Sequence, residues 1–499
     1  MGQWQRIIWG FGFCGFLLLS FLAEQTKAEN SLNLVIEGKQ LIPEVPPQII
    51  QGRTLVPIRV ISEGLGANVD WNTQSQVVTI QQDKRTIQIP IGKENTTVNG
   101  SNVPIDSPAQ IIQERTFVPI RFVSENLGIN VAWDENSQTV FVSKPYLVRF
   151  NGKNLHLEDR LLRIGTDFYV PLANLSSTLG IQAVVSSDAT KTTVIYYGKT
   201  ITLNTKTINN QLFVPVTQIE KKLQIKSHIN PTNQRIDFFQ FINLETYQNP
   251  PLPKVFNGNL LFIWKAENIS QGNVEAMINQ AKQLGVSGVF IKYANGSLVD
   301  DPVSQKYMDQ FKRLVGPFKA AGFKVGGWIY QYLSDVPGEV DATSQAIEAG
   351  ADFIVLDGED EVIGKNEQVT EFGKLLRAKY PKIPVGFSSY AVSHLHSTIP
   401  FKEYNEFVNV MMPQIYWADM EMNVEDAFNL SITDYSSFKK PILPTGQLYG
   451  AVTPTDIERF TQLNNQYKLS GISWWDWDEA TNEQLKKATC FPNGGIIMK

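Results

Sequence analysis

Two acidic side chains end an apolar run in the second half of the chain. The segment FIVLDGEDE, residues 353–361, places Asp357 and Glu359 two positions apart, directly after the apolar residues. In a strand such residues project to the same side, here in phase with Phe353 and Val355. A carboxyl pair suits glycosidic bond cleavage, because one group donates a proton and the other, ionised, stabilises developing positive charge. We expect Glu359 to be the acid and Asp357 to raise its pKa. The alternative is a solvated acidic loop.

Aromatic and polar side chains end several other apolar runs of the same region. Aromatic faces stack on sugar rings, and polar groups bind sugar hydroxyls, so these residues predict a carbohydrate site. The candidate substrate-binding residues are Trp264, Lys292, Tyr330, Tyr332, Gln414, Trp417, Trp475, Trp477 and Asp476. Part of this set could instead fill core layers. Alternation prevents Trp475 and Tyr416 from sharing a face with their immediate neighbours.

The elements that would position these residues alternate between strand and helix. The expected strands are LLFIW, GVFIKY, KVGGWIY, DFIVLD, PVGFSS, VNVMMPQIYW, PILPTG and GISWWDW. Segments with helical spacing of apolar residues separate them, and several end in glycine. Eight such repeats in about 235 residues predict a (β/α)8 TIM barrel, whose functional residues lie at the C-terminal ends of the strands. An open doubly wound sheet is the alternative, but FIWKAENIS lacks the glycine-rich phosphate loop expected after its first strand.

The first half contains an internal repeat. Arg53 and Arg115, and likewise Pro57 and Pro119, stand 62 residues apart within two segments that align without a gap. A fixed period of this kind indicates one supersecondary unit used twice. Within a unit, LVPIR reads as a short strand whose proline favours an edge or a strand start. VISEGLG reads as a short helix ended by Gly66, and NVDW with VVTI as a hairpin.

Two divergent copies follow, so the first half holds four half-repeats. They are DFYVPLANLSSTLG and QLFVPVTQIEKKLQ, with Pro171 and Pro215 in the proline position. GRTLVPIR and LGANVDW resemble the copper amine oxidase N-terminal-like domain, strongly over 33–144 and weakly over 145–242. The resemblance implies a small twisted sheet around a helix, an α+β fold that serves as a stalk.

The resemblance does not imply amine oxidation, because copper and the quinone belong to another domain of those oxidases. This chain has no Asn-Tyr-Asp/Glu quinone-forming motif. His394 and His396 are one residue apart, and His156 and His228 are the only other histidines, which is a poor ligand set for copper. We expect no metal and no cofactor.

The barrel region also resembles known families. VLDGE resembles the Asp-x-Glu of family 25 lysozymes and family 18 chitinase-like hydrolases, and MPQIYW is similar to the Met-x-Tyr segment of family 18. The resemblance implies that Glu359 is the general acid/base and that Asp357 stabilises an intermediate, through an N-acetyl group of the substrate. Tyr416 would hydrogen-bond near the reacting carbon. The chain departs from the family 18 pattern Asp-x-x-Asp-x-Asp-x-Glu, since Asp352 is present but Val355 replaces an acid.

Composition limits the partners. The 499 residues are 42% hydrophobic and 19% charged, with a net charge of -5 and a pI near 5.6, which argues against nucleic acid. An apolar run from Ile7 to Leu22 predicts a secretory signal peptide cleaved after Ala28, with an uncleaved anchor as the alternative. No second membrane span is expected, and Cys490 would be the lone cysteine after cleavage.

The expected organisation has six parts. They are a signal peptide (1–28), two stalk-like modules (29–145 and 146–242), a linker (243–258), a barrel (259–490) and a tail (491–499). We expect a secreted, cell-surface glycoside hydrolase acting on an amino-sugar polysaccharide such as peptidoglycan or an exopolysaccharide. The modules would hold the barrel at the cell envelope. The alternatives are a binding protein without turnover, and a structural envelope protein whose repeats carry the function.

Overall fold

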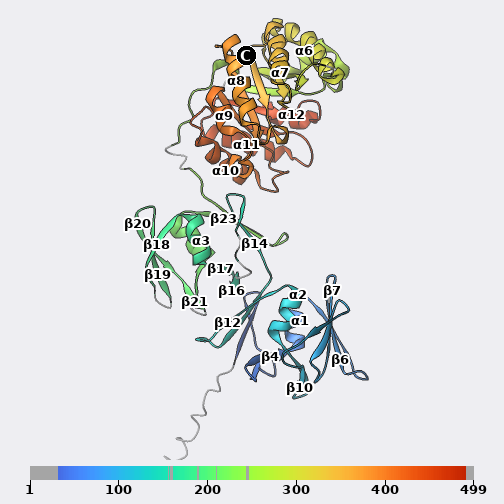
Figure 1. Ribbon diagram of the computed structural model, residues 1–499, viewed down its shortest axis with the longest axis vertical. Coiled ribbons are helices and arrows are strands. Elements are labelled where there is room, and N and C mark those ends of the chain that lie inside the picture. The colour runs from blue at the N-terminus through green and yellow to red at the C-terminus, as the bar shows by residue number, and fades with distance from the viewer. Residues whose placement is uncertain are drawn as a thin grey trace, which may run out of the picture. The chain divides into compact units, whose positions relative to one another are not determined.

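The computed structural model describes residues 32–155, 157, 161–187, 190–208, 211–242, 247–299 and 301–489. These residues form two compact units, the first reaching Phe150 and continuing from Asn154 to Phe238, the second made of Asn151–Lys153 and the residues from Phe239 on (Figure 1). The expected signal peptide, Cys490 and the expected tail lie outside the described residues. Within the described ranges, no helix has both the length and the apolar character needed to cross a membrane.

The repeat of the first unit is built around a central pair of strands. Strands β4 (Arg53–Pro57) and β11 (Arg115–Pro119) pair antiparallel in the middle of the sheet β10-β11-β4-β3. The predicted edge position of LVPIR is therefore wrong. The proline is the last residue of its strand and precedes helix α1 (Ile58–Leu65) or α2 (Ile120–Leu127), so its missing N–H is tolerated. Both helices are followed by a left-handed glycine, Gly66 or Gly128.

The predicted hairpin follows each helix. Strands β5 (Asn68–Asn72) and β6 (Val77–Gln82) pair antiparallel, which confirms the expected arrangement of NVDW and VVTI. The 62-residue period also relates two ion pairs, Arg53–Asp106 at 2.5 Å and Arg115–Glu44 at 2.8 Å. The other strands of this module are β1 (Asn33–Ile36), β2 (Lys39–Leu41), β3 (Gln48–Ile50), β7 (Arg85–Pro90), β8 (Asn95–Val98), β9 (Ser101–Pro104), β10 (Gln110–Ile112), β12 (Asn130–Asp134) and β13 (Thr139–Ser143).

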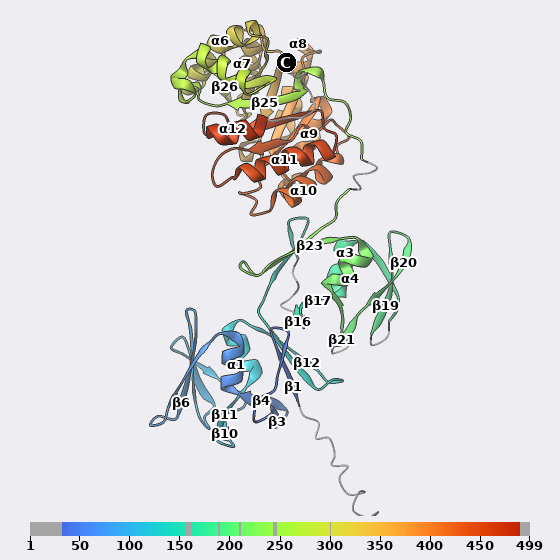
Figure 2. The same cartoon turned by 180° about the vertical axis from the view of Figure 1, so that it is seen from behind.

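The same order of elements recurs in the second part of this unit. Helices α3 (Leu172–Leu179) and α4 (Val216–Leu223) each follow a strand that ends in proline, and Figure 2 shows them beside β17. Gln224 takes the left-handed position that glycine holds in the other copies. The strands are β14 (Leu147–Phe150), β15 (Lys153–Leu155), β16 (Leu162–Ile164), β17 (Asp167–Pro171), β18 (Ile181–Ser187), β19 (Lys191–Tyr196), β20 (Lys199–Asn204), β21 (Lys206–Ile208), β22 (Gln211–Pro215), β23 (Lys226–Asn230) and β24 (Arg235–Phe239).

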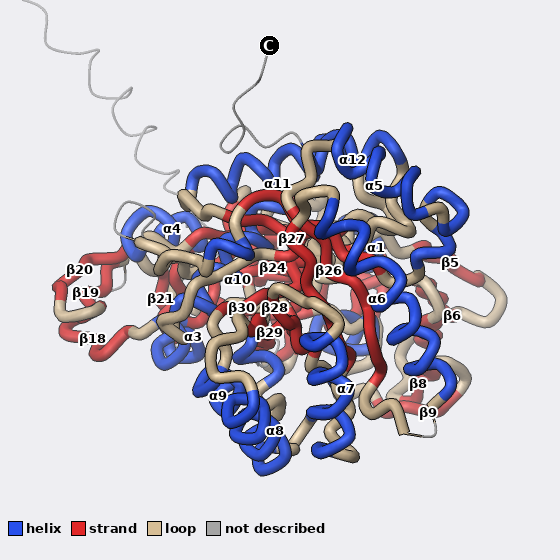
Figure 3. Tube along the Cα trace, turned by 90° about the horizontal axis from the view of Figure 1, so that it is seen from above, coloured by secondary structure: helices blue, strands red, loops and turns tan. Residues whose placement is uncertain are grey.

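The second unit is a closed barrel of eight parallel strands. The strands are β25 (Gly258–Ile263), β26 (Gly288–Asn295), β27 (Lys324–Tyr330), β28 (Phe353–Asp357), β29 (Val385–Tyr390), β30 (Val410–Ile415), β31 (Thr445–Gln447) and β32 (Gly471–Trp475). The helices outside them are α5 (Val274–Gln283), α6 (Pro302–Ala320), α7 (Val336–Glu348), α8 (Asn366–Lys379), α9 (Phe401–Phe407), α10 (Val424–Ser436), α11 (Pro454–Gln466) and α12 (Asn482–Thr489) (Figure 3). The closed strand order confirms the predicted TIM barrel and excludes the open sheet.

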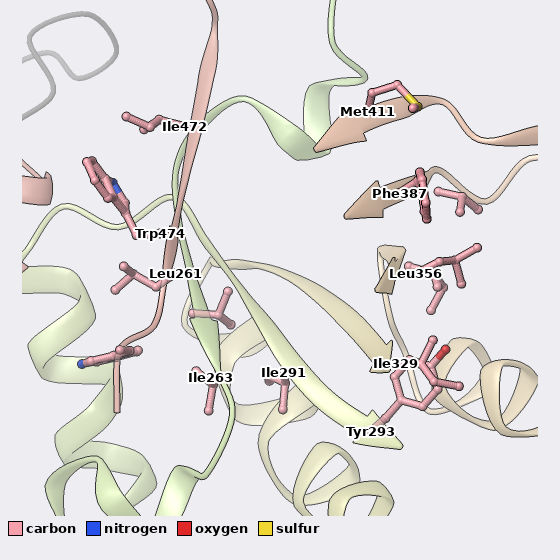
Figure 4. Packing of buried hydrophobic residues seen from close by; sticks show 14 of the residues in the cluster. Leu261, Ile263, Ile291, Tyr293, Ile329, Leu356, Phe387, Met411, Ile472 and Trp474 are labelled. Carbon is pink, nitrogen blue, oxygen red and sulfur yellow. The ribbon is translucent and has the colours of Figure 1, made fainter. Parts of the chain in front are cut away.

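Alternate residues of each barrel strand face different layers. Phe353 and Val355 lie in the cluster that fills the barrel, as their predicted phase requires. Their neighbours Ile354 and Leu356 pack in the outer cluster between strands and helices, part of which Figure 4 shows. Phe256 closes the barrel interior at the N-terminal ends of the strands. Its ring packs against that of Phe353, with centroids 4.6 Å apart. Phe256 belongs to the segment 243–258, predicted to be linker, so part of that segment is core.

Three strands do not span the whole of their apolar runs. Strand β31 covers only the end of PILPTG, because its prolines cannot donate to a ladder, and Ile442 forms an isolated bridge instead. Strand β30 ends before Tyr416, and β32 ends at Trp475. The residues that follow β30 and β32 no longer alternate between the two faces of a strand. Their side-chain directions therefore depend on the loops that contain them.

Candidate active site

A pocket of about 330 Å³ opens at the C-terminal ends of the barrel strands. Its lining comes from strands distributed around the barrel, which is where this fold places functional groups. The residues lining it are Trp264, Lys292, Asn295, Trp328, Tyr330, Tyr332, Asp357, Glu359, Gln414, Tyr416 and Trp475. The structure therefore brings together both predicted catalytic carboxyl groups, Tyr416 and most of the predicted binding residues.

The glycine between the two acids lets the chain continue past the strand end. Gly358 N–H donates to Ser388 O at 3.0 Å, and Ser389 Oγ donates to Gly358 O at 2.6 Å. A side chain on Gly358 would meet the ring of Phe387 and the hydroxyl of Tyr404, both at 2.9 Å. Close packing behind Gly358 thus holds Glu359 in the same direction as Asp357, which lies in the interior phase of β28.

One amide contacts both carboxyl groups. Gln414 Nε2 donates to Asp357 Oδ1 at 2.8 Å and to Glu359 Oε1 at 2.9 Å. The two oxygens therefore lie within about 5.7 Å of each other, a separation compatible with both acting on one sugar. The same nitrogen lies 3.1 Å from Ser388 Oγ, which also bonds Asp357.

Burial raises the pKa of both carboxyl groups. For Asp357 the causes are burial and then the charge of Glu359, opposed by Lys292 and by the bonds from Ser388 and Gln414. For Glu359 they are burial and the charges of Glu361 and Asp360, opposed by the bond from Gln414. Two interacting acids in such a site retain a shared proton at pH values where isolated carboxyl groups have lost theirs. Asp357 accepts more hydrogen bonds than Glu359, but its deeper burial raises its pKa well above the usual value, so the pair holds the proton jointly.

Aromatic rings on or just after β25, β27 and β32 also line the pocket. Trp475 packs against Trp264 and Trp328, with ring centroids 6.1 and 5.2 Å away. Trp264 Nε1 donates to the hydroxyl of Tyr307 at 3.1 Å, which fixes its indole. The pocket thus offers flat apolar faces of the kind that stack on sugar rings.

Three tyrosines border the pocket beside the acids. Tyr330 donates its hydroxyl to Glu361, and burial together with that bond raises its pKa. Tyr332 is 36% exposed and packs edge-on against Tyr330. Burial and then the charges of Asp357 and Glu359 raise the pKa of Tyr416, so its phenol stays protonated and can donate to a substrate.

Three predicted substrate-binding residues lie elsewhere. Trp417 packs against Phe460 in the outer cluster, and Trp477 is 2% exposed in that cluster. Asp476 is fully buried and accepts the backbone N–H of Glu479 at 3.2 Å. These residues follow strand ends, where the alternation that directed the prediction no longer holds. Their side chains do not line the pocket.

Sequence reasoning missed four residues of the site. Trp328 and Asn295 line the pocket, while Ser388 and Tyr307 support its acids and its indole. Trp328 and Ser388 had a signal, because each lies in the interior phase of its strand, in GGWIY and GFSSY. Tyr307 had none, since it comes from helix α6 and its contact depends on how that helix packs.

His394 and His396 do not line this pocket. His394 Nδ1 lies 2.7 Å from Asp434 Oδ1, and the His396 ring stacks on Tyr390 at 3.9 Å. Within the described residues, no group of three or more His, Cys, Asp or Glu side chains is arranged to hold a metal ion. The groups available for chemistry in the pocket are thus carboxyl, phenol, amide and ammonium.

Comparison with known proteins separates the two halves of the chain. Residues 35–142 match the family model of the copper amine oxidase N-terminal domain. No curated protein matches the chain. A chitinase catalytic domain from Pyrococcus furiosus has a similar structure, with 11% identity, coverage of 49% of this chain and 95% of that chain, and a TM-score of 0.38.

Two further solved structures are similar over the same half. A class V chitinase from Pseudomonas fluorescens has 14% identity, coverage of 46% of this chain and 98% of that chain, and a TM-score of 0.36. A chitinase-like agglutinin from Robinia pseudoacacia has 10% identity, coverage of 46% and 98%, and a TM-score of 0.35. Residues 35–142 are thus similar to the copper amine oxidase N-terminal domain, and the barrel has the fold of these solved structures.

Proposed function

We propose that the barrel is a glycoside hydrolase that cleaves an amino-sugar polysaccharide such as peptidoglycan or an exopolysaccharide. The contact of one Gln414 amide with both Asp357 and Glu359 carries this proposal. It fixes an acid pair that shares a proton at the mouth of an aromatic pocket. That pair supplies the two forms, acid and carboxylate, that glycosidic hydrolysis uses.

The two carboxyl groups of the pair take different roles. Glu359 donates its proton to the leaving glycosidic oxygen as the bond from that oxygen to the anomeric carbon breaks. Ionised Asp357 stabilises the positive charge that develops on the sugar. A water molecule then forms the new bond to the anomeric carbon and returns a proton to Glu359. Tyr416 is placed to donate its phenolic proton to the substrate beside these acids.

The test is hydrolysis by the full chain. Purified cell walls and a panel of polysaccharides are incubated with the protein, with Glu359→Gln, and with Glu367→Gln, an exposed acid of helix α8 outside the pocket. We expect release of reducing ends by the unchanged protein and by Glu367→Gln only. Loss of that release in Glu359→Gln, with the melting temperature unchanged, supports catalysis.

Binding without turnover is the competing function. Binding without turnover would be favoured if the carboxyl groups of Asp357 and Glu359 pointed apart, or if a cation held Glu359 ionised. Gln414 instead tethers both acids, and among the described residues no cation forms an ion pair with Glu359, whose pKa is raised despite the charge of Lys292. Equal binding of glycans by the protein and by Glu359→Gln, with no release from either, would establish a lectin and refute hydrolysis.

We further propose that the protein is exported and that its first half attaches the barrel to the cell envelope. The apolar segment before residue 29 and the copper amine oxidase N-terminal domain support this proposal. The test is sedimentation of the protein with purified walls, compared with a variant lacking residues 29–242. Equal sedimentation of both would refute an anchoring role, and retention in the cytoplasm on fractionation would refute export.

A further inference from the structure

The ammonium group of Lys292 lies among aromatic rings on the pocket wall. Lys292 follows Phe290 in the interior phase of β26, and only 5% of its surface is exposed. Its Nζ lies 4.3 Å from the ring centroid of Trp328 and 4.8 Å from that of Tyr307. Trp264 and Tyr330 are further away, at 5.6 and 5.8 Å. The lysine is thus held by a box of ring faces and edges.

These rings do not satisfy the donors of the ammonium group. Cation–π contacts attract the ammonium group, but a buried ammonium group also needs hydrogen bonds to offset its lost hydration. Within the described part of the chain, no hydrogen bond or ion pair joins Lys292 Nζ to a protein acceptor. Nζ donors therefore remain available to whatever occupies the pocket that Lys292 lines.

The charge of this lysine persists near neutral pH. Burial lowers its pKa to about 8, while the negative charges of Asp357 and Glu359 act to raise it. A second lysine reinforces the positive wall, because Lys265 Nζ lies 3.8 Å from the ring of Trp264. Ammonium groups therefore lie over β25 and β26 and carboxyl groups at the end of β28, with the Asp478 carboxylate, already bonded to the N–H groups of Trp264 and Lys265, on the ammonium side.

We propose that Lys292 recognises a sugar carboxylate, so that the polysaccharide cleaved here carries acidic residues next to the scissile bond. This inference rests on the proposed function for the pocket being a sugar site. A carboxylate would accept charge-assisted hydrogen bonds from the unpaired donors and neutralise the buried charge. Hydroxyl groups offer weaker bonds, and a free amine would be repelled by both lysines.

The ligand-side test needs no change at Lys292. The full chain with Glu359→Gln, which blocks turnover, is titrated by calorimetry with an acidic oligosaccharide and with its carboxyl-reduced counterpart. A sugar carboxylate can belong to a hexuronate or to the lactyl ether of an amino sugar. One pair of ligands therefore carries a hexuronate and the other pair carries a lactyl ether, each compared with its carboxyl-reduced form. We expect the acidic form of one pair to bind about 10- to 100-fold more tightly than its reduced form. Equal affinities in both pairs, or no binding, would overturn the inference.

The protein-side test removes the charge and keeps the length of the side chain. Lys292→Met, added to Glu359→Gln, should abolish the preference for the acidic form and leave the affinity for the reduced form unchanged or higher. The matched control is Lys324→Met, a partly buried lysine at the start of β27 that donates to Lys254 O and Asn257 O. That control should keep the preference. A preference that survives in Lys292→Met would overturn the inference.

The readouts separate this inference from the proposed function. Lysine-dependent binding of acidic sugars, without hydrolysis by the unchanged protein, would refute hydrolysis and keep the role of Lys292. Hydrolysis of acidic polymers and of their carboxyl-reduced forms with equal kcat/KM by the unchanged protein, and with the same values by Lys292→Met, would keep hydrolysis and refute the carboxylate. Melting temperatures are measured for each variant. If Lys292→Met does not fold, the ligand-side comparison alone decides whether Lys292 recognises a carboxylate.

Discussion

Gln414 Nε2 lies 2.9 Å from Glu359 Oε1, and the same nitrogen lies 2.8 Å from Asp357 Oδ1. The amide therefore couples the positions of the two acids and lowers the pKa of each. Without it, each buried carboxyl group would lose a donor that no neighbour replaces.

The first prediction concerns this amide. Gln414→Met keeps the volume but removes the donor, and we expect kcat/KM on the polysaccharide to fall about 10- to 100-fold, the cost of one or two lost bonds to charged groups. The alkaline limb of the pH profile should also move to higher pH. Gln305→Met, an exposed change on α6, serves as the control. An unchanged profile in Gln414→Met would contradict the role given to the amide.

The second prediction concerns Asp360, whose negative charge lies next to the acid pair. Asp360 raises the pKa of Glu359, because a nearby negative charge disfavours the ionised form. Asp360→Asn should lower that pKa, so the alkaline limb of kcat/KM, where Glu359 loses its proton, should move to lower pH by less than about one unit. The shift should shrink at high salt. A limb that moves upward would exclude Glu359 as the group that must be protonated.

The third prediction compares two adjacent tryptophans. Trp474 is buried in the outer cluster, whereas Trp475 lines the pocket. Trp474→Ala should lower the free energy of unfolding by about 3–5 kcal/mol through cavity formation. Trp475→Ala should cost less stability and instead raise KM, because a stacking face is lost. Urea titrations and kinetics on both variants give the comparison, and equal stability losses would mean that Trp475 is mainly a core residue.

The fourth prediction concerns a buried acid at the start of α7. Glu339 Oε1 accepts N–H bonds from Leu333 at 2.5 Å and Tyr332 at 3.2 Å, and burial raises its pKa to about 7. The folded protein thus binds a proton that the unfolded chain releases near pH 4.5. The stabilisation is complete below pH 4.5 and is lost as pH rises to about 7, by on the order of 3 kcal/mol.

Glu339→Gln tests this linkage. The variant cannot ionise at this position, so its free energy of unfolding should fall less than that of the unchanged protein between pH 4.5 and 7. Urea titrations at a series of pH values measure the difference. Parallel curves for the two proteins would show that Glu339 has the same pKa folded and unfolded. The result also bears on the pocket, because the carboxylate holds the segment that carries Tyr332.

The sequence by itself determined the two architectures and the main acids. A 62-residue period and alternating apolar strands and helices are local patterns, and local patterns persist whatever the chain packs against. The phase of Phe353 and Val355 sufficed to aim Asp357 into the barrel mouth. Closure of the barrel then brought Gln414, from a strand two along, within reach of it.

Tertiary structure decided the residues outside that alternation. Trp417 and Trp477 follow strand ends, so their directions depend on loops and helices that pack over them, and both became core. The partner of Trp264 comes from helix α6, and the donors of Lys292 are unpaired because the surrounding positions are filled by rings. Such contacts join residues distant in the chain, and sequence spacing contains no information about which of them meet.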